Sequence, residues 1–185
     1  MRIISGKFKG KKILKPKDKL TRPLKDLTKE SIFNIIKHSN LHNLDLEKAN
    51  ILDVFSGVGS FGLECLSRGC SKVTFCENYP SVLQILKTNI HNLKCENQTK
   101  IIEKDIFSND ALISLKDKFD LIFLDPPYKE KKLSNLLEKI INLKILNNDG
   151  IFIIHRHKKE KDEYAKKFEV LKEKTYGISK IIFGR

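Results

Sequence analysis

The apolar run at residues 121–124 is followed directly by an Asp-Pro-Pro-Tyr tetrapeptide at residues 125–128. A short apolar run of this kind is typical of a strand that is buried on both faces, as in parallel sheets. The two prolines end the strand, because proline has no N–H group for the next rung of the sheet. The carboxyl ends of such strands are where open α/β sheets bind ligands. Asp-Pro also begins ordinary turns, so this pattern needs support from elsewhere in the chain.

The rest of the chain alternates apolar runs with segments of helical periodicity. Strands are predicted at residues 51–55, 72–76, 100–104, 120–124 and 151–154, the fourth of which contains the apolar run described above. Helices are predicted at residues 26–37, 61–68, 80–93, 110–116 and 133–141. Residues 168–176 and 178–183, separated by Gly177, predict a closing β-hairpin. This order predicts an α/β fold, with a doubly wound, mostly parallel seven-stranded sheet and an antiparallel C-terminal hairpin.

Three local details refine this prediction. In the first helix, Asp26 is the expected cap, and an apolar face is expected from Leu27, Ile32, Phe33, Ile35 and Ile36. Residues 148–150 (Asn-Asp-Gly) predict a turn before the fifth strand, and the polar segment 158–167 predicts a solvated helix. Residues 1–25 are expected to form a basic N-terminal arm or hairpin, and residues 26–185 a single domain.

The distribution of charge suggests a polyanionic partner. The net charge is +13, with +8 in residues 1–30 and +5 in residues 155–185, so that the segment between them is neutral. A coding bias toward lysine would have made the middle basic as well, so nucleic acid is the favoured partner. No apolar run has membrane-spanning length, no signal peptide is recognised, and the four cysteines form no C-x-x-C pair. We therefore expect a cytoplasmic protein with reduced thiols and no metal site.

A glycine-rich turn predicts the cofactor site. Residues 57–62 match G-x-G-x-x-G after the first strand, a pattern shared by dinucleotide and S-adenosylmethionine sites. A carboxylate just before this turn suits a cationic ligand better than a pyrophosphate, which favours S-adenosylmethionine over NAD. Glu77 is expected at a ribose hydroxyl group and Asp105 at an adenine amino group. The candidate cofactor residues are Asp53, Phe55, Gly57, Gly59, Gly62, Glu77, Asp105 and Ile106.

These motifs resemble those of the bacterial 16S rRNA guanine-N2 methyltransferase (RsmD) family of class I methyltransferases. The resemblance covers the opening residues 1–13, Arg22-Pro23, residues 30–34, the cofactor turn at 52–64, the tetrapeptide at 125–128 and Tyr176-Gly177. It departs at Leu24 and Lys25, where the family has small hydroxyl residues, and at Leu27 and Lys29, where it tends to have arginine. The resemblance implies a Rossmann-like fold and methyl transfer to N2 of a guanine in small-subunit ribosomal RNA.

The predicted reaction uses the tetrapeptide to accept the amino group. Its catalytic residues are Asp125, Pro126, Pro127 and Tyr128, and the expected phosphate contacts are Lys7, Lys9, Lys11, Lys12, Arg22 and Lys25. His155 and His157 are interpreted as the polar end of a strand. The expected partner is ribosomal RNA or a small-subunit assembly intermediate, and we expect a monomer. The alternatives are a DNA adenine-N6 methyltransferase, a non-enzymatic RNA-binding assembly protein and an NAD-dependent reductase.

Overall fold

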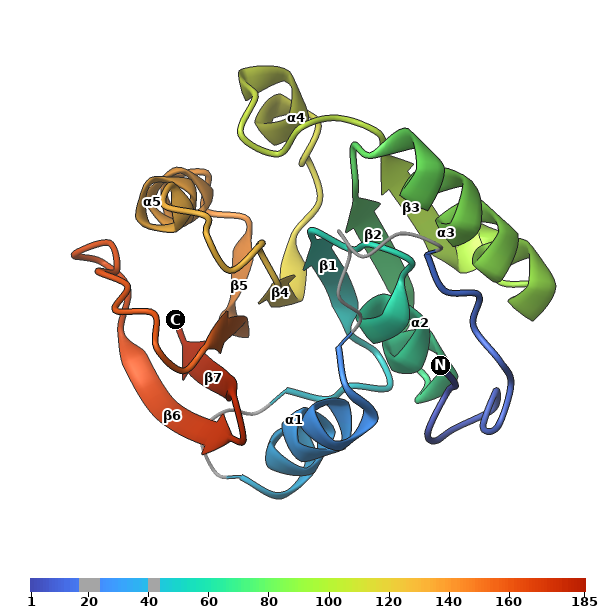
Figure 1. The fold of residues 1–185 in the computed structure, drawn as a ribbon. Coiled ribbons are helices and arrows are strands. Elements are labelled where there is room, and N and C mark those ends of the chain that lie inside the picture. The colour runs from blue at the N-terminus through green and yellow to red at the C-terminus, as the bar shows by residue number, and fades with distance from the viewer. Residues whose placement is uncertain (17–23, 40–43) are drawn as a thin grey trace.

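The computed structural model describes residues 1–16, 24–39 and 44–185, and its centre is a seven-stranded sheet (Figure 1). The strand order is β3-β2-β1-β4-β5-β7-β6. The strands β1 to β5 are parallel, and β7 runs antiparallel to both β5 and β6. The strands are β1 Asn50–Val54, β2 Lys72–Cys76, β3 Thr99–Ile102, β4 Phe119–Leu124, β5 Leu146–His157, β6 Val170–Tyr176 and β7 Ser179–Gly184. The predicted doubly wound sheet with an antiparallel C-terminal hairpin is confirmed.

Helices cover both faces of the sheet and form two hydrophobic clusters. They are α1 Asp26–His38, α2 Ser60–Ser67, α3 Pro80–Leu93, α4 Asn109–Ile113 and α5 Leu133–Asn142, with a 3₁₀ turn at Glu96–Gln98. One cluster joins α1, α2 and α3 to the sheet, and the other joins α4 and α5 to the opposite face. The helices α3 and α5 each bury one apolar stripe, whereas every residue of α2 is buried. Within the described residues, no helix is long and apolar enough to cross a membrane.

Residues 1–16 form a hairpin that packs on α2 and α3. Arg2 and Lys12 form a single antiparallel bridge, so the hairpin holds together without regular strands. The side chains of Ile3 and Ile13 are buried in the same core cluster as α2. Gly6 adopts a φ of +81° at the point where the hairpin meets the end of α2. A Cβ there would lie 1.8 Å from the Ser67 carbonyl oxygen, so this contact requires glycine.

A buried charge network fixes this hairpin to α1 and α2. The Glu64 carboxylate is fully buried and accepts hydrogen bonds from the backbone N–H groups of Ile4 at 2.8 Å and Ser5 at 3.0 Å. It also pairs with the fully buried Lys29 ammonium at 3.3 Å and with Arg68 at 2.9 Å. The carboxylate thus links the hairpin, α1 and the end of its own helix α2.

The first helix differs from its prediction in two respects. Lys25 occupies the N-cap position and Asp26 begins the helix, with no side-chain cap hydrogen bond. The predicted apolar face omits Thr28 and Lys29, which are buried, and includes Leu27, which is 69% exposed. Lys29 breaks the pattern because the Glu64 carboxylate compensates its charge inside the core. Its burial also removes Lys29 from any surface contact with RNA.

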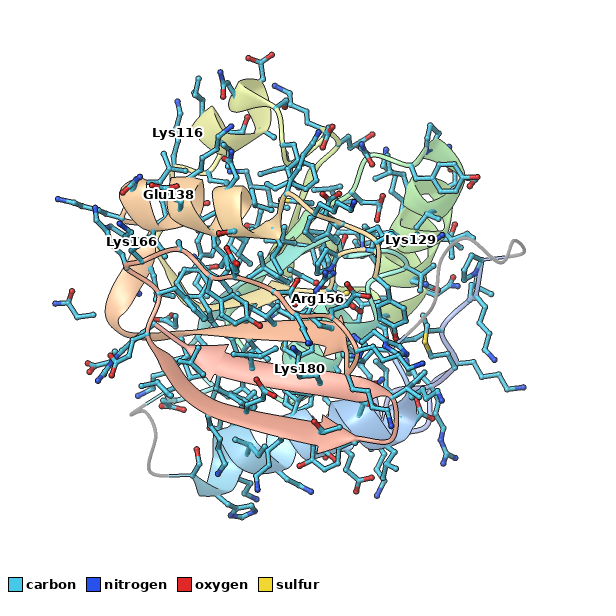
Figure 2. All side chains as sticks on the ribbon, turned by 60° about the vertical axis from the view of Figure 1, so that its left-hand side comes forward. Lys116, Lys129, Glu138, Arg156, Lys166 and Lys180 are labelled. Atoms are coloured by element: carbon cyan, nitrogen blue, oxygen red, sulfur yellow. The ribbon has the colours of Figure 1, made fainter. Side chains whose placement is uncertain are left out.

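The region around β5 also differs from its prediction. Residues 148–150 belong to the continuous strand β5, which changes register against β4 between the pairs Phe119↔Leu146 and Leu121↔Ile151. Residues 158–167 form no helix. The Asp162 carboxylate in that segment binds the buried Arg156 guanidinium at 2.8 Å, and this ion pair holds the chain in an irregular path. Arg156 lies beside Lys180 on the adjoining strand β7 (Figure 2).

Candidate active site

The candidate site lies where the strand order reverses between β1 and β4. From β1 the chain winds outward to β2 and β3, and β4 then pairs with the other side of β1. Val54 at the end of β1 is in register with Cys76 on β2 and Leu124 on β4. Phe55, Glu77 and Asp125 therefore follow these ends at the same edge of the sheet. Such a reversal opens a crevice at the carboxyl ends of the strands.

Asp53 is the most deeply buried carboxylate of this edge. It is 1% exposed, and its Oδ2 atom accepts a hydrogen bond from the Gly62 backbone N–H at 2.9 Å. Burial raises the pKa of Asp53 well above its ordinary value, the Gly62 N–H opposes this rise, and the negative charges of Asp125 and Glu77 add to it. The structure thus brings together three of the four predicted strand-end carboxylates. A cationic ligand would relieve this mutual repulsion.

The glycine-rich turn is held close to β2 by packing and by a hydrogen bond to a side chain. Gly62, in the first turn of α2, packs so closely on β2 that a Cβ would lie 2.4 Å from the Phe75 ring. Gly59 adopts a φ of +85°, and Glu77 accepts a hydrogen bond from the Gly57 N–H at 2.8 Å. The glycines therefore let the turn pass close to β2. The carboxylate of Glu77 links the turn to the end of that strand.

Two aromatic rings lie beside the ends of β1 and β3. Phe55 has a φ of +64°, a strained backbone conformation for a bulky residue. Its ring meets the Phe107 ring with centroids 5.8 Å apart. Asp105 accepts a hydrogen bond from the Phe107 N–H at 3.0 Å, and the neighbouring Ile106 is buried. This half-buried aromatic pair next to an exposed carboxylate suits a planar heterocycle with an amino group.

The tetrapeptide leaves the sheet at the end of β4. The Asp125 side chain is 20% exposed, Pro126 is buried and Pro127 is exposed. The Pro127 carbonyl oxygen accepts hydrogen bonds from Arg156 at 3.1 Å and from the Glu130 N–H at 2.9 Å. In the part of the chain that the structure describes, no hydrogen bond to the Pro126 carbonyl oxygen is found. That carbonyl and the Asp125 carboxylate are therefore the acceptors that the tetrapeptide offers to a ligand.

The end of β5 holds the tetrapeptide in place, a role that the sequence analysis missed. His155 contacts Asp125 at 2.7 Å, Arg156 binds the Pro127 carbonyl, and the His157 ring meets the Tyr128 ring edge-on at 5.2 Å. The signal was present in the sequence as three consecutive basic or imidazole side chains at a strand end. Only the pairing of β5 with β4, with Ile154 opposite Leu124, brings them to the tetrapeptide.

The candidate phosphate-binding residues lie on the surface. Lys7, Lys9, Lys11 and Lys12 are exposed on the hairpin, and Lys25 is exposed just before α1. Arg22 lies outside the described residues. The Lys7 ammonium bonds the Gln98 side chain at 2.9 Å and lies over the Phe8 ring.

The cysteine thiols are shielded by burial, including Cys76 at the end of β2 beside the site. The four cysteines are buried and unpaired, and burial raises the pKa of the Cys70 and Cys76 thiols to about 12. Neither thiol is therefore a nucleophile at neutral pH. Within residues 1–16, 24–39 and 44–185, no group of three or more His, Cys, Asp or Glu side chains has the arrangement of a metal site.

Comparisons with known proteins match nearly the whole chain. The family model described as conserved hypothetical protein 95 matches residues 1–185. The Bacillus subtilis protein YlbH is 34% identical over 182 residues, which cover 97% of this chain and 95% of that protein. A Haemophilus influenzae protein named ribosomal RNA small subunit methyltransferase D is 33% identical over 187 residues, covering 96% and 90%. The solved structure of Escherichia coli yhhF has a TM-score of 0.80 at 22% identity, covering 100% of this chain and 96% of that one, and it shows the same fold.

Proposed function

This chain belongs to the conserved hypothetical protein 95 family, the RsmD family of class I methyltransferases, and we propose that it methylates N2 of a guanine in 16S ribosomal RNA. The observation that carries the proposal is the pair of acceptors at the end of β4. The Asp125 carboxylate and the Pro126 carbonyl can receive the two N–H groups of one exocyclic amine. The rRNA substrate follows the name of the Haemophilus influenzae relative, and it implies a cytoplasmic protein.

S-adenosylmethionine is the methyl donor of this family. Its sulfonium and ammonium groups are cationic, and the carboxylates of Asp53 and Glu77 supply the matching negative charge. The aromatic pair of Phe55 and Phe107, with Asp105 beside it, suits the adenine ring. When bound, the cofactor supplies an electrophilic methyl group, and its C–S bond breaks as the new N–C bond forms. The residues of the site fit this ligand.

The protein has to make a poor nucleophile reactive. The lone pair of an exocyclic amine is delocalised into the base, so the amine reacts only when it is turned and held. Asp125 and Pro126 accept its two N–H groups and direct the lone pair toward the methyl group, and most of the acceleration comes from this positioning. The proton released from the methylated nitrogen passes to the Asp125 carboxylate and then to water. Tyr128 stacks on a base that has left its helix.

The basic hairpin supplies the phosphate contacts in this proposal. Five lysines lie exposed on the hairpin, the four candidates and Lys15, and its buried side anchors it to α2 and α3. Lysine contacts with phosphates add affinity without specifying sequence. Specificity for one guanine would come from the shape of the RNA around the extruded base.

The proposed substrate is tested by methyl transfer from labelled S-adenosylmethionine into ribosomal RNA, small-subunit particles and DNA. Nucleoside analysis of the product should show N2-methylguanosine from RNA. N6-methyladenine from DNA would instead identify the rival activity, since the tetrapeptide suits either amine. Calorimetric titration with S-adenosylmethionine and with NADH separates the methyltransferase from the reductase and from an assembly protein that binds neither.

Replacing the acceptor carboxylate tests the mechanism. Asp125→Ala should abolish methyl transfer, because the amine then loses one of its two acceptors. Binding of S-adenosylmethionine, measured by calorimetry, should remain nearly intact, since Asp53 and the glycine-rich turn are unchanged. Transfer at a near wild-type rate by this variant would rule out the mechanism.

A further inference from the structure

His155 lies between two partners at the end of β5. Its Nδ1 atom is 2.7 Å from Oδ1 of Asp125, and its Nε2 atom is 3.0 Å from the Ser179 hydroxyl on β7. The His155 side chain is 6% exposed. The strand pairing explains the contacts, because β5 lies between β4, which ends at Asp125, and β7, which begins at Ser179. A buried imidazole thus bridges the catalytic carboxylate and a buried hydroxyl group.

The partners determine which nitrogen of His155 carries the proton. An ionised carboxylate only accepts hydrogen bonds, so Nδ1 donates to Asp125. In the neutral ring Nε2 is then an acceptor, and the Ser179 hydroxyl donates to it. The Asp125 carboxylate therefore determines the tautomer of His155, and the Ser179 hydroxyl, which can donate as well as accept, complements it. The order of groups is hydroxyl, imidazole, carboxylate, with the carboxylate facing the crevice.

The contact also divides the two oxygens of Asp125 between protein and ligand. Oδ1 receives the imidazole N–H, whereas no described residue donates a hydrogen bond to Oδ2. A carboxylate held at one oxygen cannot rotate freely about its side-chain torsions. Its other oxygen then keeps one direction toward the crevice, beside the Pro126 carbonyl.

We propose that His155 is a positioning residue for the methyl transfer, holding Oδ1 of Asp125 so that Oδ2 receives the substrate amine, with Ser179 fixing the orientation of the imidazole ring. The inference rests on the proposed function of Asp125. His155 does not touch the substrate amine; it acts through the carboxylate. Its loss should therefore lower kcat and leave the KM for RNA and the dissociation constant of S-adenosylmethionine almost unchanged.

Two amide substitutions separate this role from simple filling of buried space. The side-chain amide of His155→Asn can occupy the place of Nδ1 and donate to Asp125, whereas that of His155→Gln reaches the place of Nε2. H155N should keep kcat within about threefold of wild type, whereas H155Q and H155L should lose about 100-fold, as a misplaced reacting group does. Single-turnover rates, RNA binding and thermal unfolding are measured for all three. A kcat loss of the same size in H155N and H155Q would overturn the proposal.

A second pair of variants tests the role of Ser179. Ser179→Ala should lower kcat about tenfold in the wild-type background, because the imidazole ring then loses the partner that fixes its orientation. In the H155N background the same substitution should change little, since the shorter Asn side chain places no atom at the position of Nε2 to contact Ser179. Equal losses in the two backgrounds would show that Ser179 acts only through packing. His91→Asn is the matched control, because His91 pairs with Glu96 at 2.9 Å on the surface of α3.

A measurement without turnover distinguishes this inference from the proposed function. Nitrogen-15 NMR of the histidine side chains should show His155 protonated at Nδ1 in the wild-type protein, with a changed Nε2 chemical shift in S179A, where that nitrogen loses its hydrogen bond. Protonation at Nε2 would overturn the inference even if the enzyme is active. If the wild-type protein methylates neither RNA nor DNA, the proposed function fails, and the NMR result still decides the geometry.

Discussion

At the scale of single residues, Asp53 shows how a binding group is placed at a cost to stability. Its carboxylate is buried against the Gly62 N–H, beside two other carboxylates that raise its pKa. The ionised form is therefore unfavourable in the folded protein without a cationic ligand. When the pKa of a group is higher in the folded protein than in the unfolded chain, its contribution to the free energy of unfolding is largest below the unfolded-state pKa. That contribution is lost as the pH rises through the folded-state pKa.

This dependence of stability on pH gives a prediction for Asp53→Asn. The amide oxygen can still accept the Gly62 N–H bond but carries no charge, so the variant should melt at a higher temperature than wild type at pH 8. The difference should shrink toward about pH 3, below the ordinary pKa of aspartate, where the carboxyl group is almost fully protonated in both states. The same substitution should weaken S-adenosylmethionine binding by about tenfold, or about 1.4 kcal/mol. Calorimetry across this pH range measures both, and a variant less stable than wild type at pH 8 would contradict the assignment.

At the scale of elements, Glu64 joins three segments of the chain. Its carboxylate lies on α2, its ammonium partner Lys29 on α1, and its two backbone donors, Ile4 and Ser5, on the N-terminal hairpin. Charges buried in this way need all of their partners, because an unpaired charge in the core is strongly unfavourable. The hairpin is therefore integral to the folded domain, and its lysines are presented on a fixed surface.

Glu64→Gln should accordingly cost about 3–5 kcal/mol of unfolding free energy, since it leaves the buried Lys29 without its counter-charge. The matched control is Glu103→Gln, because the Lys87–Glu103 pair, at 2.6 Å, is about half exposed. That change should cost about 1 kcal/mol or less. Urea denaturation monitored by circular dichroism compares the two. Equal costs would show that the buried network contributes no more than a surface pair.

At the scale of the whole molecule, the hairpin connects the basic surface to the crevice. One end lies against Ser67 at the end of α2, and the Leu14 N–H donates to the Asn89 side chain on α3. The Asn89 amide in turn donates to the Val58 carbonyl in the glycine-rich turn at 3.0 Å. The hairpin thus runs from the amino-terminal edge of the sheet, where Lys7 meets Gln98, toward the glycine-rich turn. Figure 2 places Lys116 and Lys166 on another side of the molecule.

Two pairs of lysines test this surface without disturbing the core. Replacing Lys9 and Lys12 by glutamine should weaken RNA binding and lower the slope of log K against log salt by about 0.7 for each phosphate of single-stranded RNA that is no longer neutralised. The same change at Lys116 and Lys166 removes equal charge and should leave that slope almost unchanged. Filter binding over a range of salt concentrations measures both. Equal slopes for the two double variants would exclude the hairpin as the RNA-binding surface.

Much of this architecture was predictable from local patterns. Apolar runs ended by Gly, Pro or Asp predicted the strands of the parallel sheet, because a strand's burial and its end are properties of a few adjacent residues. Parallel strands bring their carboxyl ends to one edge, and the structure confirms that Asp53, Glu77 and Asp125 interact there. The predicted helix at 158–167 was wrong because the Arg156–Asp162 pair, rather than the local pattern, determines the path of that segment.

The segment from Asp125 to Tyr128 shows which features follow from adjacent residues and which depend on contacts with distant parts of the chain. Adjacent residues alone predict that a carboxylate and two stiff peptide units follow a buried strand, since proline geometry is local. The side chains that hold them come from distant parts of the chain. His155 reaches Asp125 across 30 positions because β5 pairs with β4, and Lys29 is buried because α1 packs its ammonium on Glu64. Such contacts depend on which elements become neighbours, and no short stretch of sequence carries that information.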